Sequence, residues 1–368
     1  MTGPPFLNDM CSILIHFRVH KYGFSTDIEK AFLHVTLDEA DRDFTRFLWL
    51  SDHKDPESKF QVYRFKVVLF GSVSSPFMLY AALHHHLTKN PSPISEDMQN
   101  NLYVDNVISG CNSESDVVHY YKKSRSIMSQ ANFNLRTWAS NSTLLQNLAK
   151  RDGSAETSDI VKILGLQWNT SSDTLSLVPR NITNSTPFIT KRDILQDSSR
   201  IFDPLGFVTP VTIQAKIFLQ ELWGKCLQWD EPLHDDLKNK WNVISQNIQD
   251  ATTLISIPRQ YFQFTPSSSA TIHVFADAST KAYGAVVYLH QNNQISFIMS
   301  KTRVAPLKQL TLPRLELMGA VLAARLSNFI LRSFQHTQLH TSIHLWSDSQ
   351  IVLHWINSKK KLKQFVSH

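Results

Sequence analysis

The stretch YGFSTDIEKAF, from Tyr22 to Phe32, sets the strongest constraint on the fold because it ends a strand-like run with an aspartate. Asp27 ends the run Gly23 to Asp27, inside the strand-like stretch Tyr22 to Ile28 and just before an apolar helix-like segment. A second aspartate, Asp105, stands in NLYVDN (101–106), between the apolar pairs expected of a β-hairpin. Two-metal phosphoryl transfer needs carboxylates that converge from separate strands on two magnesium ions about 4 Å apart. Taken singly, the aspartates are better explained as a helix N-cap and a turn residue, but together they predict such a site.

The residues around these aspartates alternate strand-like and helix-like runs, which is the pattern of an α+β domain. A polar stretch follows and indicates a boundary region. The segments concerned are further strands at Gln61 to Val68 and Asn101 to Val104, helices at Leu79 to Leu87 and Ser115 to Gln130, and the boundary at Asn141 to Asp159.

Beyond the boundary the pattern changes. A short strand pair is expected at Lys162 to Trp168 and Thr174 to Leu177. From Lys191 onward the sequence favours helices, interrupted only by DPLG from Asp203 to Gly206. This part is therefore expected to be a helical connector.

A further unit begins after the Pro- and Ser-containing stretch from Pro258 to Ser269. Its expected order is three strands, helix, strand, helix: Ile272 to Ala276, Gly284 to His290, Ile295 to Ser300, Pro313 to Phe334, Ser342 to Trp346 and Ser349 to Ile356. Asp277 lies on the first strand, Glu316 early in the long helix, and Asp348 at the end of the fourth strand. Singly, Glu316 is explained by the helix dipole and Asp348 as an N-cap, but three acids at such positions are less easily a coincidence.

Composition supports an intracellular, globular, nucleic-acid-directed protein without deciding the matter. The 368 residues are 42% hydrophobic and 18% charged, enough for about two or three domains. Lys and Arg outnumber Asp and Glu by 37 to 31, which favours binding to polyanions, although proteins that bind none often show such a balance.

Three cysteines without a CxxC pair suggest a reducing compartment and no zinc site. The sequence has no apolar run near the ~18 residues that would predict a membrane span, and no signal peptide is expected.

Several of these motifs resemble those of reverse transcriptases. DIEKAF (27–32) is similar to the first palm motif, YVDN (103–106) to the YxDD turn, and LFGSVSSPF (69–77) to the loop and helix that cradle template and incoming nucleotide. DRDFTRFLW (41–49), IFDPLGFVTP (201–210) and LPRLELMGAVLAARL (312–326) are similar to BEL/Pao retrotransposons specifically. The resemblance covers nearly the whole chain.

This resemblance implies roles for individual residues. Asp27 and Asp105 would be catalytic metal ligands, joined by Asn106, a neutral amide where the broad family pattern has a second aspartate. Phe32 would be the aromatic gate that excludes a ribose 2'-hydroxyl. Phe70 and Gly71 would contribute to the nucleotide pocket.

The order of the acids in the last unit matches the RNase H family. By that resemblance Asp277, Glu316 and Asp348 would be catalytic and would bind metal. Two Mg²⁺ ions, or Mn²⁺, are expected at each site. Because the family's basic finger strands and its fourth acidic ligand lie outside the matched motifs, partial fingers and a C-terminally truncated RNase H domain are expected.

The expected fold class is thus a multidomain α+β and α/β protein. Residues 1–150 would form a palm with partial fingers, 151–265 a thumb and connector, and 266–368 an RNase H-like three-layer domain. The expected function is RNA-directed DNA polymerisation with an RNase H-like activity, in an element capable of DNA integration. Its expected partners are RNA template, DNA primer, RNA–DNA hybrid, dNTPs and other Pol polyprotein segments, in a cytoplasmic virus-like particle or the nucleus. The alternative is an inactive remnant that only binds nucleic acid.

Three other features carry less weight. His84, His85 and His86 point about 100° apart on a helix and cannot converge on one ion. The basic run at Lys359 to Lys361, with Lys363, is more simply a solvated face than a phosphate contact. An aspartic protease is disfavoured because the sequence has no Asp-Thr/Ser-Gly triplet.

Overall fold

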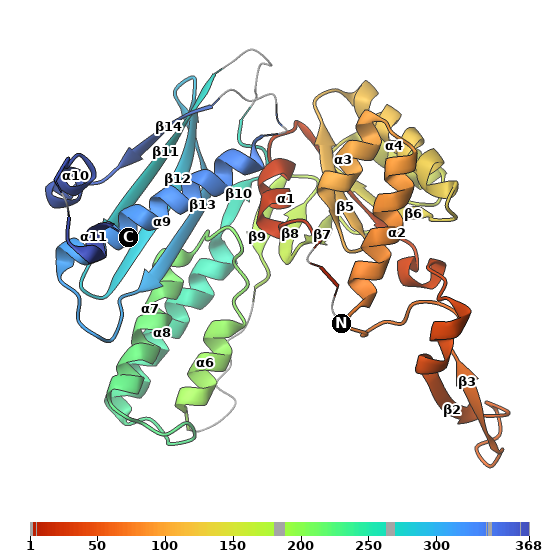
Figure 1. Cartoon of the computed structure of the whole chain (residues 1–368), viewed down its shortest axis with the longest axis horizontal. Helices are drawn as coiled ribbons and strands as arrows, with labels where there is room; N and C mark the ends of the chain where they lie inside the picture. Colours follow the sequence, from red (N-terminus) through yellow and green to blue (C-terminus); the bar gives the residue numbers. More distant parts are fainter. Residues whose placement is uncertain are drawn as a thin grey trace. The chain divides into compact units, whose positions relative to one another are not determined.

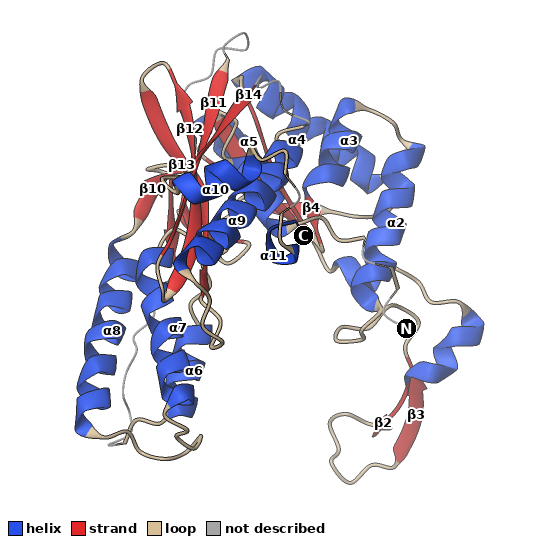
Figure 2. Ribbon diagram, turned by 60° about the vertical axis from the view of Figure 1, so that its left-hand side comes forward, coloured by secondary structure: helices blue, strands red, loops and turns tan. Residues whose placement is uncertain are grey.

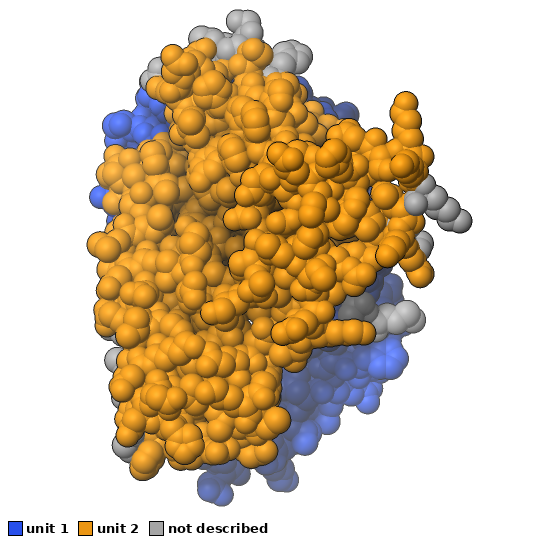
Figure 3. Space-filling model, turned by 90° about the vertical axis from the view of Figure 1, so that its left-hand side faces the viewer, with its two compact units in different colours: residues 1–13, 20–159 blue, residues 14–19, 160–368 orange. Residues whose placement is uncertain are grey.

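The computed structural model describes residues 3–4, 6–179, 188–262, 269–335, 337, 341–360 and 362–367. Two compact units divide the chain (Figure 3). Unit 1 comprises residues 1–13 and 20–159, and unit 2 comprises residues 14–19 and 160–368. The helix α1 (Met10–Phe17) contributes residues to both units. The domain limits expected at residues 150 and 265 stay predictions.

A four-stranded sheet in the order β4-β5-β1-β6 forms the centre of unit 1. The central strand β1 (Tyr22–Ile28) pairs antiparallel with β5 (Asn106–Cys111) and β6 (Leu135–Ser140), and β4 (Leu102–Tyr103) pairs with β5. The helices of the unit, visible in Figures 1 and 2, are α2 (Ser75–Lys89), α3 (Pro93–Asn101), α4 (Glu114–Ser129) and α5 (Thr143–Arg151). Serine N-caps at Ser92, Ser113 and Ser142 explain where three of them begin, since each hydroxyl accepts a main-chain N–H of the first turn.

The helix α5 corrects the sequence interpretation of Asn141 to Asp159 as a boundary region. Leu145 and Ala149 are fully buried, so the polar composition hides one apolar helix face. The unit itself ends at Asp159.

Unit 1 also contains a separate two-stranded hairpin, which extends away from the four-stranded sheet (Figure 1). Its strands are β2 (Arg46–Leu50) and β3 (Phe60–Arg64), and the short 3-10 helices η1 (Ala31–His34) and η2 (Glu39–Thr45) lead to it from β1. The strand expected at Gln61 to Val68 is shorter than predicted, and Val67 forms only an isolated bridge to Thr36.

The first part of unit 2 is a small sheet joined to helices. The sheet has the order β10-β9-β8-β7, with β7 (Ile160–Ile163), β8 (Leu166–Asn169), β9 (Thr174–Leu177) and β10 (Ser256–Pro258). The connector helices are α6 (Lys191–Ser199), α7 (Thr209–Gly224) and α8 (Asp235–Leu254), and they pack around Trp241. The helices that the sequence favours from Lys191 onward are thus present.

The second part of unit 2 is a mixed sheet in the order β13-β12-β11-β14. Its strands are β11 (Ala270–Ala278), β12 (Ala282–Gln291), β13 (Gln294–Val304) and β14 (Thr341–Trp346), of which β14 runs parallel to β11. The long helix α9 (Leu312–Ser333) packs on one face, and α10 (Gln350–Ile356) and α11 (Gln364–Ser367) follow β14 (Figure 2). The predicted order of three strands, helix, strand and helix is confirmed.

The DPLG turn joins the connector to this sheet. The carboxylate of Asp203 accepts the main-chain N–H groups of Phe207 and Val208 at 2.8 and 2.9 Å. Gly206 has φ +77°, and a Cβ there would lie 2.2 Å from the main-chain oxygen of Ser300, so only glycine fits. The hydroxyl of Ser300 donates to the oxygen of Gly206 at 2.6 Å. The turn is therefore fixed against β13.

Across the described residues, every helix is too short or too polar to cross a lipid bilayer.

Candidate active sites

The first candidate site lies where β1 and the β4–β5 turn meet. Asp27 on β1 is paired in register with Asn106, the first residue of β5. The main-chain N–H of Ile28 donates to the oxygen of Asp105 at 2.8 Å. The fold thus brings together the two aspartates that the sequence singled out, from positions 78 residues apart (105 minus 27).

Two residues of this site have unusual backbone angles. Val104, next to Asp105 in the turn, has φ 57°, and Thr137 on β6 has φ 52°. The left-handed region is unfavourable for β-branched side chains, so both conformations are strained. Strain of this kind concentrates at functional sites, which supports a function for the turn.

The carboxylates are already hydrogen-bonded within unit 1. The hydroxyl of Thr137 donates to Oδ1 of Asp27, and the amide of Asn106 donates to Oδ1 of Asp105 at 2.8 Å. Arg136, on the same strand as Thr137, forms an ion pair with Glu29 at 2.5 Å. The sequence interpretation missed Thr137, Arg136 and Glu29, because nothing in LRTW (135–138) signals that this strand pairs with β1.

Burial raises the pKa of both aspartates. For Asp27 the loss of solvent is the main cause, the charge of Asp105 adds to it, and its own backbone hydrogen bond and the charge of Arg136 oppose it. For Asp105 the main cause is again burial, opposed by hydrogen bonds from the backbone and from Asn106. Two half-buried carboxylates beside an amide supply oxygen ligands of the kind that divalent cations bind, so the donor set fits such an ion.

The residues expected to line a nucleotide pocket also meet. The ring of Phe32 contacts the ring of Phe70 edge-on, with centroids 5.0 Å apart. Phe32 is 8% exposed and anchored, whereas Phe70 is 67% exposed. Gly71 has φ +81° with open space where a Cβ would stand, so its conformation, not its surroundings, requires glycine.

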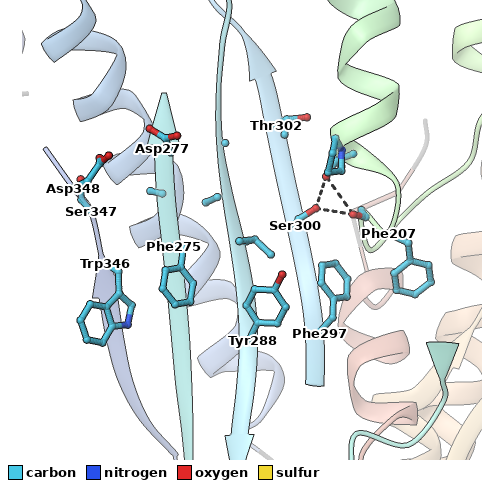
Figure 4. Close-up of a pocket in the computed structure, with 17 residues that line it drawn as sticks. Phe207, Phe275, Asp277, Tyr288, Phe297, Ser300, Thr302, Trp346, Ser347 and Asp348 are labelled. Atoms are coloured by element: carbon cyan, nitrogen blue, oxygen red, sulfur yellow. Dashed lines mark hydrogen bonds between the residues drawn. The ribbon is translucent and has the colours of Figure 1, made fainter. Parts of the chain in front are cut away.

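The second candidate site lies at the ends of β11 and β14. Phe275 and Trp346 are register partners on these parallel strands, and Asp277 and Asp348 each follow two residues later. Asp277 shares a face of the sheet with Phe275, because side chains two residues apart on a strand lie on one face, and Asp348 lies just beyond the end of β14. Both aspartates line a cavity of about 800 Å³ (Figure 4).

An aromatic row forms the floor of this cavity. Figure 4 shows Trp346, Phe275, Tyr288 and Phe297 across four strands, with Phe207 of the connector beside them. Neighbouring ring centroids along the row lie 5.7 to 6.2 Å apart. The sequence interpretation missed this row, although the two-residue alternation in β11 and β12 could have revealed it.

Glu316 approaches this site from the other face of the sheet. The hydroxyl of Ser349 donates to its Oε2 at 2.5 Å, which ties α9 to the start of α10. A Cβ on Gly319, one helical turn further along α9, would lie 3.3 Å from the oxygen of Asp277, so α9 lies close against β11 there. Glu316 is not among the residues that line the cavity. Within the described ranges, no three acidic, histidine or cysteine side chains are grouped closely enough to hold a metal ion.

The histidine run at 84–86 and the basic run at 359–361 were given less weight in the sequence analysis, and their surroundings agree with a structural role. Nε2 of His86 lies 2.7 Å from the oxygen of Ile127, while His84 and His85 are exposed. Lys359 and Lys360 are exposed, and Lys361 lies outside the described residues.

Comparison with known proteins accounts for most of the chain. Residues 7–167 match the family of reverse transcriptases (RNA-dependent DNA polymerases), and residues 190–349 match the Pao retrotransposon-like RNaseH-like domain. No curated protein matches the sequence. Among solved structures, the foamy viral protease-reverse transcriptase in complex with RNA/DNA hybrid is similar in fold (TM-score 0.58, 14% identity, covering 98% of this chain and 44% of that one).

A second structure, the foamy viral protease-reverse transcriptase dRH in complex with ds DNA, gives the same TM-score of 0.58 at 16% identity, covering 94% of this chain and 54% of that one. The chain therefore spans about half the length of the structures that it matches. At this level of identity the likeness shows the fold.

Proposed function

Because the chain is the reverse transcriptase and RNase H-like region of a Pao/BEL-type retrotransposon, we propose that it extends a DNA primer on an RNA template and cleaves the RNA of the resulting hybrid. Reverse transcriptase and RNase H-like domains generally use divalent metal ions. We assign two Mg²⁺ or Mn²⁺ ions to each site, with phosphoryl transfer as the shared chemistry.

The observation that best supports polymerisation is the pairing of Asp27 with the Asp105 turn. The two carboxylates come from adjacent strand ends and are half-buried, and the charge of one raises the pKa of the other. When bound, the metal ions would activate the primer hydroxyl and stabilise the pyrophosphate. Asp27 and Asp105 would hold them, with Asn106 as a neutral ligand or as the group that orients Asp105.

The aromatic pair would select the nucleotide. Phe32 is buried and contacts the exposed Phe70, so together they offer an apolar wall. Such a wall would exclude a ribose 2'-hydroxyl, which would lose its hydration without gaining a partner. The left-handed backbone at Gly71 would let the main chain approach the triphosphate.

Hydrolysis of the RNA strand is assigned to Asp277, Glu316 and Asp348. Two of these acids line the same cavity, and Ser349 orients the third through its hydroxyl. Asp277 and Asp348 would hold the ions that activate a water against the phosphodiester, whereas Glu316 is assigned by the resemblance alone.

The proposed partners are nucleic acids and nucleotides. The foamy viral structures with this fold hold an RNA/DNA hybrid in one case and double-stranded DNA in the other. For this chain we propose an RNA template, a DNA primer, their hybrid and dNTPs, together with other segments of a Pol polyprotein. The proposed setting is a cytoplasmic virus-like particle or the nucleus.

A second candidate function is nucleic-acid binding without catalysis. It is favoured by Asn106, whose amide supplies no negative charge and donates to Asp105 at 2.8 Å, so that it uses one of the oxygens available to a metal ion. Under this alternative the net charge of +6 would still attract nucleic acid.

Primer extension separates the two functions. The full chain is tested with Mg²⁺ on a poly-A template with an oligo-dT primer, beside Asp27→Asn, Asp105→Asn and the control Asp250→Asn on the exposed surface of α8. The proposal predicts extension by the wild type and the control, and a loss of at least about 100-fold in the two site variants. Absence of extension from every protein, with primer–template still bound, would establish the alternative.

A further inference from the structure

Residues Leu14–Val19, here called the anchor segment, belong to unit 2 although unit 1 surrounds them in the sequence. Four of the six are almost completely buried: Leu14, Ile15, Phe17 and Arg18 are each 2% exposed or less. Phe17 contacts Trp168 of β8 edge-on, with ring centroids 5.0 Å apart. The anchor segment is thus part of the core of unit 2.

Arg18 connects the anchor segment to two distant strands. Its guanidinium donates to the main-chain oxygens of Arg259 at 3.0 Å, Phe297 at 2.8 Å and Pro258 at 3.4 Å. It also lies over the ring of Tyr261, 4.1 Å from the centroid. The main-chain N–H of Tyr261 returns a hydrogen bond to the oxygen of Arg18 at 3.0 Å. A single side chain therefore joins the anchor segment to β10 and β13.

Arg259, which follows β10, donates a hydrogen bond back to the anchor segment. It is fully buried, donates to both carboxylate oxygens of Asp173 at 2.6 and 2.9 Å, and donates to the oxygen of Phe17 at 2.7 Å. Asp173 lies in the turn between β8 and β9. A buried guanidinium is costly unless all its donors are used, so these partners must be in place together.

We propose that Arg18 and Arg259 make the folding of unit 2 depend on the anchor segment. The anchor segment contributes a short apolar helical end followed by an arginine whose donors meet main-chain oxygens. Three residues after the anchor segment, at Tyr22, β1 begins and leads to Asp27. Arg18 is a structural residue of unit 2, and its role stands whether or not the chain has the proposed activities.

Hydrogen exchange of the full chain tests this dependence. Arg18→Met keeps the length of the side chain but leaves the oxygens of Arg259 and Phe297 without their donor. The matched control is Arg192→Met in the same unit, where a guanidinium with a 60% exposed side chain pairs with Asp230 on the surface. Arg18→Lys serves as the milder variant if Arg18→Met does not fold.

The proposal predicts that both Arg18 variants speed amide hydrogen exchange in β10 and in β13 around Phe297 by about tenfold or more. These strands lie about 240 and 280 residues from Arg18 in the sequence. The control should leave these strands unchanged. Faster exchange confined to α1 and β1, or an equal effect of Arg192→Met, would overturn the proposal.

Discussion

At the scale of single residues, the candidate polymerase site has two unfavourable features. Some of its residues have strained backbone angles, and others carry carboxyl groups that are partly buried. Val104 and Thr137 adopt left-handed angles, and burial raises the pKa of Asp27 and Asp105. Such costs persist only where the surrounding structure enforces them, and they are characteristic of functional sites. The sequence identified Asp27 and Asp105 through their motifs, but Thr137 and Arg136 follow only from the pairing of β1 with β6.

The raised pKa values predict how stability depends on pH. A carboxyl group whose pKa is higher in the folded protein favours folding when protonated, so its ionisation costs stability as pH rises from the unfolded value of 3.8 through the raised folded value. Asn at position 27 cannot ionise and removes this cost. We expect Asp27→Asn to gain stability relative to wild type between pH 4 and pH 7, measured by urea unfolding in EDTA.

The same measurement on Asp250→Asn provides the control, since that carboxyl group is exposed. A difference between wild type and Asp27→Asn that is independent of pH would contradict the assignment.

Gly71 gives a second prediction at this scale. Its φ of +81° is unfavourable for any side chain, while the space beside it is open. Gly71→Ala should therefore cost about 1–2 kcal/mol of backbone strain if the loop keeps its shape. Gly224→Ala at the end of α7, also in open space but without the positive φ, should be neutral or slightly stabilising. Equal unfolding free energies for the two variants would show that the loop does not need glycine.

At the scale of elements, the sequence predicted those with strong local signals. The strand β1, the helix α9 and the chain order of strands and helices in the last unit follow from periodicity and from the turns between them. The helix α5 was hidden because its sequence is largely polar, and Leu145 and Ala149 are its only fully buried residues. The three-residue strand β10 was missed for a different reason, since it is defined by pairing with β9 about 80 residues earlier.

Ser349, at the start of α10, allows a test of whether this helix contributes to the second candidate site. The hydroxyl of Ser349 accepts the N–H of Val352 as an N-cap and donates to Glu316. Ser349→Ala should cost about 1 kcal/mol of stability and release Glu316, which lowers cleavage of the RNA in a hybrid. Ser92→Ala, which removes the N-cap of α3 in unit 1, should cost similar stability without affecting cleavage. Cleavage that falls equally in both variants would indicate a loss of folding rather than a role at the site.

At the scale of the whole molecule, the two units are not consecutive in sequence. The anchor segment was invisible to motif analysis because its partners lie up to about 280 residues away. Local patterns report which residues form a helix or strand, whereas buried polar junctions such as Arg18 with Phe297 depend on the completed fold.

The net charge of +6 leads to a prediction for the molecule as a whole. If nucleic acid is bound through its phosphates, affinity for a primer–template should fall by about tenfold or more between ~50 and ~200 mM salt, because binding releases counterions. Fluorescence anisotropy with a labelled hybrid measures this effect. Affinity that does not change with salt would argue against phosphate contacts.

The central claim is that one chain holds two separate phosphoryl-transfer sites. The most direct test is a single Mg²⁺-dependent reaction on an RNA–DNA hybrid with a recessed DNA primer, in which primer extension and RNA cleavage are followed together. The account predicts that Asp27→Asn abolishes extension but not cleavage, and that Asp277→Asn abolishes cleavage but not extension. Loss of both activities in either variant, or of neither, would contradict it.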